Sequence, residues 1–258
     1  MARPHIEFVE SGAIPKLPVS EGPFAGTQQR LLSADGDGGG DYSATVTFPA
    51  GWSGDLSGRT RPTELFTLSG ELTVAGRAVG PGVYAFVGSG AEGATVRATT
   101  GGETVAVVFV EPEEEPRREI EVVDTNELAW VGPPADGQVP QGIVVKRLRY
   151  HPVSGDATWV AAVVPAWRET RAEIHDTIEE CLMLRGDILL GERGVMTAGS
   201  YFWRPPNVEH GPMFSLRGGT FYFRSKGGNL ATVHVPVPGW EKLVESYKAR
   251  EPFYLGTL

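Results

Sequence analysis

Residues 173–186 read EIHDTIEECLMLRG, and residues 199–210 read GSYFWRPPNVEH. The first stretch places His175 four residues before Glu179 and ends at a glycine, whereas the second begins at a glycine and ends at His210. A histidine, an acid and a distant second histidine, all on short strands separated by glycine turns, form a pattern typical of metal ligands. The rest of the chain is interpreted as the scaffold of this site.

The composition favours a protein built of many short strands. The chain has 258 residues, 41% of them apolar, with 34 glycines and 20 prolines. This length accommodates one large domain or two small ones, and the glycines and prolines supply the turns. The formal net charge of −9 argues against nucleic acid or an anionic membrane as a partner.

The sequence also indicates a compartment. Cys181 is the one cysteine, so no internal disulfide can form and a reducing environment is expected. No stretch approaches the ~18 apolar residues of a membrane span, and no N-terminal apolar run resembles a signal peptide. We therefore expect a soluble cytoplasmic protein without a membrane partner.

The chain reads as two copies of one unit. Residues 6–9 (IEFV) match residues 120–123 (IEVV), and the charged, proline-containing segment 111–118 (EPEEEPRR) has the character of a linker. We therefore expect an N-terminal domain over 1–114 and a C-terminal domain over 115–258. Further pairs match at offsets between 114 and 117: Arg30 with Arg147, Pro49 with Pro165, Gly70 with Gly186, Gly82 with Gly199 and Gly101 with Gly218.

Strand signals dominate both copies, which predicts an all-β fold with a sandwich or barrel architecture. The tail differs, because Trp240, Leu243, Val244 and Tyr247 recur on one stripe and predict a short C-terminal helix up to about Arg250. The predicted strands cover residues 42–48, 65–74 and 104–110 in the first copy, and 159–164, 181–190 and 220–224 in the second.

The spacing His-x3-Glu-x6-Gly followed by Gly-x5-Pro-x4-His is similar to the two cupin motifs. The chain thus resembles a bicupin, nearest to the ChrR-like cupins, whose pattern also has paired acids such as Glu179-Glu180 before an apolar strand. The resemblance covers nearly all of both units. It implies two double-stranded β-helix (jelly-roll) domains in tandem, on a fold that hosts dioxygenases, isomerases, decarboxylases, lyases and non-enzymatic binders.

The sequence departs from the cupin pattern at two positions. Glu173 stands where the family usually has the first histidine of His-x-His, and Asn207 stands where a glycine is usual. Asparagine also tolerates a left-handed turn, so the turn is expected to form.

The resemblance and the strand pattern together give the candidate ligands Glu173, His175, Glu179 and His210. Residues two apart on a strand share a face, so Glu173 and His175 should point the same way. Glu173 is either a ligand or a general base beside the metal. Two imidazoles with one or two carboxylates suit one divalent metal ion, with Fe(II) favoured and Zn, Mn or Ni as alternatives.

The first copy has no equivalent ligands. Arg59 stands at the position of His175, Thr63 at that of Glu179, Ser57 at that of Glu173 and Gly93 at that of His210. We therefore expect metal only in the second unit.

Strand parity also suggests which residues line a substrate pocket. The alternative is that the aromatic residues and Cys181 are core and the arginines are solvated. His5, His151 and His234 have no partner at a useful spacing. The candidate pocket residues are Cys181, Tyr201, Trp203, Tyr222, Arg224 and Arg147.

The resemblance implies a metal-dependent enzyme acting on a small organic molecule. The favoured reaction is an O2-dependent C–C cleavage of an enolisable diketone or hydroxyketone, with Glu173 as ligand or catalytic base. Two alternatives stay open: a redox-neutral isomerase, lyase or decarboxylase, and a non-catalytic metal-binding or sensory cupin. The expected partner is a small-molecule substrate, and a homodimer is compatible with the sequence.

Overall fold

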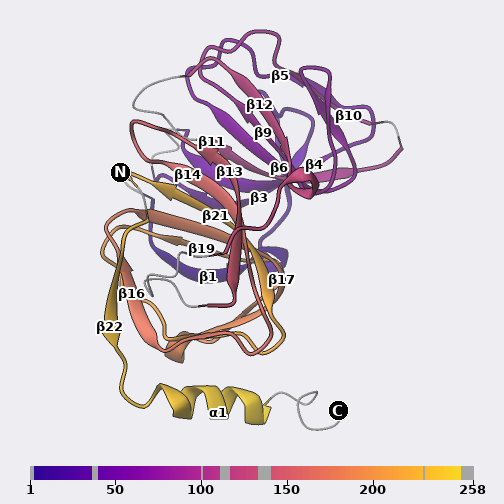
Figure 1. The fold of residues 1–258 in the computed structure, drawn as a ribbon. Coiled ribbons are helices and arrows are strands. Elements are labelled where there is room, and N and C mark those ends of the chain that lie inside the picture. Colours follow the sequence, from indigo (N-terminus) through magenta and orange to yellow (C-terminus); the bar gives the residue numbers. More distant parts are fainter. Residues whose placement is uncertain are drawn as a thin grey trace. The chain divides into compact units, whose positions relative to one another are not determined.

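The computed structural model describes residues 3–36, 40–99, 101–110, 117–132, 141–228 and 230–250. Within them the chain is mostly β-sheet, with one α-helix, α1 (Trp240–Arg250), near the C-terminus (Figure 1). The predicted all-β class and C-terminal helix are confirmed. The chain divides into two compact units, one made of Met1–Pro4 with Ser11–Ala129 and the other of His5–Glu10 with Trp130–Leu258.

The first unit contains two sheets. Seven strands pair in the order β12-β9-β6-β11-β4-β3-β2, and four pair in the order β5-β10-β7-β8. Apolar side chains such as Val46, Leu65 and Val108 fill the interior between them. The elements are η1 (Ser11–Ala13), β2 (Leu17–Pro18), β3 (Gln28–Ala34), β4 (Tyr42–Phe48), β5 (Ser53–Asp55), β6 (Thr63–Ser69), β7 (Leu72–Val74), β8 (Arg77–Val79), β9 (Val83–Val87), β10 (Thr95–Ala98), β11 (Thr104–Val110), β12 (Ile120–Asp124) and η2 (Thr125–Glu127).

The second unit has one large sheet, whose main path is β1-β19-β17-β21-β14-β13, with β15, β18 and β20 attached beside it. A separate ribbon pairs β16 with β22, and these two strands run side by side in Figure 1. The elements are β1 (Ile6–Glu10), β13 (Ile143–Tyr150), β14 (Ala157–Val163), β15 (Arg168–Glu169), β16 (Arg171–His175), β17 (Ile178–Leu190), η3 (Gly191–Arg193), β18 (Val195–Thr197), β19 (Ser200–Arg204), β20 (Met213–Phe214), β21 (Gly219–Lys226) and β22 (Thr232–Pro236).

The same strand order occurs in both units. The path β12-β9-β6-β11-β4-β3 in the first corresponds to β1-β19-β17-β21-β14-β13 in the second. The register corresponds too, because Thr63 lies opposite Val87 and Glu179 lies opposite Arg204, as the sequence offsets of 116 and 117 require.

The boundary differs from the predicted one at residue 114. Strand β12 follows the predicted boundary but pairs with β9 in the first unit, whereas β1 from the N-terminal end pairs with β19 in the second. Ile120 and Val122 pack against the first core and Phe8 against the second, so apolar burial holds each strand in the sheet of the other copy. Residues 111–116 of the predicted linker lie outside the described residues.

Each unit also contains a buried carboxylate–phenol pair at the corresponding position. The hydroxyl of Tyr84 donates to Glu64 Oε2 over 2.9 Å, and that of Tyr201 donates to Glu180. Glu180 therefore faces away from Glu179, as expected for neighbours on a strand.

Helix α1 packs on the second unit through Val244 and Tyr247, which join Leu189 and Phe214 in a small apolar cluster. In the part of the chain that the structure describes, no helix has the length and apolar character needed to cross a membrane.

Candidate metal centre

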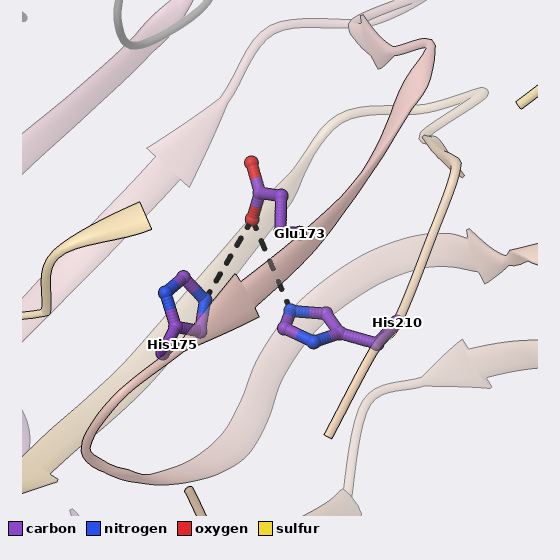
Figure 2. A group of neighbouring side chains, drawn as sticks. All are labelled: Glu173, His175 and His210. Carbon is purple, nitrogen blue, oxygen red and sulfur yellow. Dashed lines mark ion pairs between the residues drawn. The ribbon is translucent and has the colours of Figure 1, made fainter. Parts of the chain in front are cut away.

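Strand β16 carries two of the four candidate ligands. Glu173 and His175 lie on the same face of this strand, as the alternation predicted, and β22 pairs along it with His234 opposite Glu173 and Thr232 opposite His175. Figure 2 shows Glu173 and His175 on one strand and His210 approaching from a separate segment.

His210 is held in place by the backbone. The amide of Glu173 donates to the carbonyl of His210 over 2.8 Å, and the amide of His210 donates back over 3.0 Å. The preceding turn is closed by Asn207. Its backbone N–H donates to the carbonyl of His175, and its φ is 66°. The prediction that Asn207 replaces glycine in a left-handed turn is confirmed.

Glu173, His175 and His210 form a compact set. Glu173 Oε2 lies 3.9 Å from Nε2 of each histidine, and the ligand atoms of the three residues all lie within 4.8 Å of one another (Figure 2). Ligands bound at ~2.1 Å around one ion are separated by similar distances.

The histidines are oriented so that Nε2 is available. Nδ1 of His175 lies 3.1 Å from the carbonyl of Ala231, and Nδ1 of His210 lies 3.3 Å from the carbonyl of Val208. A ring whose Nδ1–H donates to a carbonyl presents a lone pair at Nε2, which is how metal-bound histidines are commonly fixed. Nε2 of His175 is buried without a hydrogen-bond partner among the described residues, so the residues present fit a divalent metal ion.

Glu179 lies at the edge of this set. Its Oε2 is 3.6 Å from Nε2 of His210, but it also accepts a hydrogen bond of 3.1 Å from Arg204 Nη1. Glu179 and Arg204 face each other across β17 and β19. Arg204 therefore competes with a metal for the Glu179 carboxylate, and Glu173 is the better placed carboxylate ligand.

Burial and charge shift the acidities of these groups. Burial raises the pKa of Glu173 to about 8, and the nearby charges of Glu179 and Glu169 add to this effect. Burial also raises the pKa of Glu179, but electrostatic attraction to His210, Arg204 and His175 outweighs this effect, so this pKa lies below its ordinary value. Burial lowers the pKa of His210 to about 4, so its imidazole is neutral at physiological pH and able to bind a cation.

A cavity of about 240 Å³ opens beside these residues. Its walls are mostly apolar, and its polar lining residues are Glu173, His175, Glu179, Arg204, His210 and Thr232. A largely apolar cavity with a few convergent polar groups is the usual form of a small-molecule site. The aromatic wall residues are Trp159, Trp167, Phe202, Phe221 and Phe223.

Most of the predicted pocket residues are not in this wall. Tyr201, Trp203 and Tyr222 are buried on the opposite face of the large sheet. Register explains this, because Cys181, which shares the face of Glu179, lies opposite Phe202 and Phe223. The residues predicted to share a face do so, but the prediction of which face of β19 and β21 lines the cavity is wrong, because their phenylalanines face it.

The other three predicted pocket residues are also placed elsewhere. Arg224 Nη1 donates to Glu180 Oε2 over 2.6 Å behind the sheet, and Arg147 is exposed with its guanidinium 5.4 Å from the ring of Tyr150. Cys181 points to the inner side but is buried in the apolar core, where burial raises the pKa of its thiol well above the usual value.

Two neighbours of the centre were not predicted from the sequence. Arg204 is inward because it shares the face of Phe202 on β19, a signal that needed the correct parity of that strand. His234 was expected to lack a partner, yet its Nε2 lies 3.5 Å from Glu173 Oε1 and 3.7 Å from Glu169 Oε2. These two carboxylates and His234 form a second close group beside the first.

Residues 110–232 match a family described as a domain of unknown function (DUF4437), and this stretch contains all four candidate ligands. No curated protein matches the chain.

Solved structures share the fold. A protein from Nostoc punctiforme, named as a candidate dioxygenase, superposes with a TM-score of 0.73 at 16% identity, covering 90% of this chain and 87% of that one. A candidate glyoxylate-induced protein from Pseudomonas aeruginosa gives 0.67 at 18% identity, covering 88% and 91%. Oxalate decarboxylase from Bacillus subtilis, described with Mn(II) centres, gives 0.55 at 11% identity, covering 96% and 85%.

The fold is a cupin fold. At these identities the likeness concerns the fold alone. The spacing of the two glycine-bounded stretches thus indicated the correct fold.

Proposed function

We propose that the second unit binds one divalent metal ion through His175, His210 and a carboxylate, for which Glu173 is better placed than Glu179, and acts as an enzyme on a small organic molecule. The observation that carries the proposal is the convergence of two carbonyl-oriented histidines and a largely buried carboxylate on the lining of a mostly apolar cavity. Two histidines and one carboxylate with open positions suit Fe(II), and Zn, Mn or Ni are alternatives. When bound, such an ion supplies Lewis acidity and, in the case of iron, a site for dioxygen.

The protein groups have separate roles in this proposal. Glu173 is either the third ligand or the base that takes a proton from the substrate, because its Oε2 lies 3.9 Å from Nε2 of both histidines on the cavity lining. Arg204 fixes Glu179 next to the ligands. The aromatic walls orient the apolar part of the substrate and exclude water.

The reaction that we favour is an O2-dependent C–C cleavage of an enolisable diketone or hydroxyketone. It is supported by the ligand set and by the shared fold with the Nostoc punctiforme protein. A redox-neutral reaction is the second candidate, supported by the shared fold with oxalate decarboxylase. The finer resemblance to the ChrR-like cupins stays a prediction, as do a cytoplasmic location and a homodimer.

The first unit is proposed to be a structural partner without metal. Arg59 and Thr63 stand at the positions of His175 and Glu179, and no group of potential ligands was found among its described residues.

Elemental analysis of purified protein tests the site. We expect one divalent ion per chain and its loss in the double variant His175→Ala/His210→Ala. The variant His5→Ala, at an exposed histidine that is not in the cavity lining, is the control that should keep the ion. Two ions per chain, or metal retained in the double variant, would contradict the proposal.

Oxygen uptake distinguishes the reactions. With a panel of diketones and hydroxyketones, the iron-loaded protein should consume oxygen in step with substrate loss. Product formation without oxygen uptake would identify the redox-neutral alternative, and metal binding without any turnover would favour a sensory role.

A further inference from the structure

The polar atoms of the cavity are unevenly partnered. Of the buried side-chain nitrogen and oxygen atoms on its lining residues, four have no hydrogen-bond partner within the described part of the chain: Nε2 of His175, Nε1 of Trp167, and Nε and Nη2 of Arg204. The first is assigned to the metal. The other three are N–H donors, and a buried donor without an acceptor is costly.

Arg204 is the largest source of these donors. Its side chain is 2% exposed, and of its nitrogens Nη1 has a described hydrogen bond, to Glu179. Nη2 lies 3.5 Å from Glu7 Oε1, at the limit of hydrogen bonding. The guanidinium carbon lies 3.6 Å from the centre of the ring of Phe202, a residue of the cavity wall.

The formal charges around the cavity also do not cancel when a divalent ion is bound. Glu173, Glu179 and Arg204 together carry one negative charge when both carboxylates are ionised, so a divalent ion leaves one positive charge in an apolar enclosure. An uncompensated buried charge is unfavourable, and a ligand of opposite charge removes it. The neighbouring ion pairs add no net charge: Glu7 with Arg193 and Glu169 with Arg171.

From these observations we propose that the cavity takes an organic monoanion, whose carboxylate or enolate oxygen accepts hydrogen bonds from Arg204 and Trp167 while an aromatic or branched apolar body fills the space between Phe202, Phe221 and Phe223. This inference rests on the proposed function, because it needs the metal charge. It narrows the substrate class from a small organic molecule to a singly charged acid or enolate, which includes the enolate of the diketone favoured above.

Calorimetric titration of the Zn(II)-loaded protein tests the inference, since Zn(II) is redox-inert and leaves the ligands unconsumed. The probes are 3-phenylpropionate and its neutral isostere 3-phenylpropanamide. A third probe, 1-phenylbutane-1,3-dione, is followed by the absorption of its enolate and distinguishes an enolate from a carboxylate. The variants are Arg204→Gln and, as a matched control, Arg193→Gln, which removes a guanidinium that also contacts Glu7 but lies outside the cavity lining.

The wild type and Arg193→Gln should bind at least one anion ~10-fold or more tightly than the amide, on the scale of a charge-assisted hydrogen bond in a buried site. Arg204→Gln should lose this preference while keeping its Zn(II). Equal binding of acid, amide and diketone by the wild type, or an unchanged preference in Arg204→Gln, would overturn the inference without touching the metal site.

Two further variants keep the test decisive if Arg204→Gln loses its metal or does not fold. Arg204→Lys keeps the charge and should retain the preference with weaker binding. Trp167→Phe keeps an aromatic side chain but removes the N–H donor, and it should weaken binding of the anion more than binding of the amide. Unchanged anion affinity in both variants would refute the inference. Zn(II) content is measured first in every sample, and a wild type that binds no Zn(II) would refute the proposed function together with this inference.

Discussion

Glu173 joins two groups of side chains. Its Oε2 faces His175 and His210, and its Oε1 lies 3.5 Å from Nε2 of His234. The carboxylate therefore has neighbours on both sides, and we expect a change at this residue to affect the proposed metal site.

The variant Glu173→Gln separates the two roles proposed for this residue. If Glu173 is a ligand, the metal affinity should fall by ~10-fold or more, as for other losses in a metal's immediate surroundings. If it is a base, the metal should stay bound while turnover falls by ~100-fold or more. Chelator competition and steady-state rates measure the two quantities.

Glu179→Gln is the matched comparison. Because Arg204 engages the Glu179 carboxylate, we expect a smaller loss of metal affinity than in Glu173→Gln. The reverse order would show that Glu179 is the carboxylate ligand, and full metal content with full activity in Glu173→Gln would assign Glu173 neither role.

Metal binding should tighten as the pH rises. Glu173 has a pKa of about 8 in the metal-free protein, so below this pH a bound cation must displace its proton. The affinity should therefore increase about tenfold per pH unit between roughly pH 5.5 and 7.5 and level off above about 8. His210, with a pKa of about 4, is already neutral throughout this range.

Chelator competition at several pH values checks this dependence, with Glu173→Gln as the control. The variant has no proton to displace at this position, so its affinity should change much less over the same range. An equally steep dependence in the variant would assign the proton to another group.

Strand β17 is the element that links the centre to the sheet. It carries Glu179 near its start and pairs with both β19 and β21. Further along, it contains Gly186, which has a φ of 83°. A Cβ at Gly186 would lie 1.9 Å from the carbonyl oxygen of Gly218. The strand thus needs glycine both for its backbone angle and for close contact.

The variant Gly186→Ala should be strongly destabilised. The left-handed backbone costs ~1–2 kcal/mol for alanine and the overlap adds ~1–3 kcal/mol, which corresponds to a fall of several degrees in Tm. Gly76→Ala is the control, because Gly76 has a φ of 76° but no atom within 4 Å of the added Cβ. Calorimetric melting curves compare the two, and equal Tm values would contradict the close-contact argument.

At the scale of the whole molecule, each unit contains the opening strand of the other copy. Strand β1 completes the edge of the second sheet and brings Glu7 to Arg204, whereas β12 completes the first. A cut anywhere between the copies therefore separates a sheet from one of its strands.

Residues 117–258 alone should be poorly soluble. The fragment lacks β1, so the edge of β19 and the apolar surface under Phe8 are exposed, and it carries β12 without its partner β9. Sedimentation and circular dichroism would measure this. A synthetic peptide of residues 3–12 should raise its solubility and melting temperature, and a scrambled peptide should not. A well-folded, fully active fragment without the peptide would contradict the expectation.

Local sequence patterns were sufficient for several features. Alternation and turn residues predicted the strands, with β4 and β11 at the bounds observed, and a 3.6-residue period predicted α1. The spacing of His175, Glu179 and His210 indicated the cupin fold, and parity on one strand placed Glu173 beside His175. These features depend on neighbours in the chain, so the sequence by itself determined them.

Only the tertiary structure decided which face of β19 and β21 lines the cavity and which sheet takes β1 and β12. Alternation along a strand is compatible with two opposite orientations until the strand is paired with one whose inner face is known. Register against Glu179 is what turns Arg204 and Phe202 inward and Tyr201 and Trp203 outward. The same long-range pairing brings His234 to Glu173, a contact between residues 61 positions apart that no local pattern encodes.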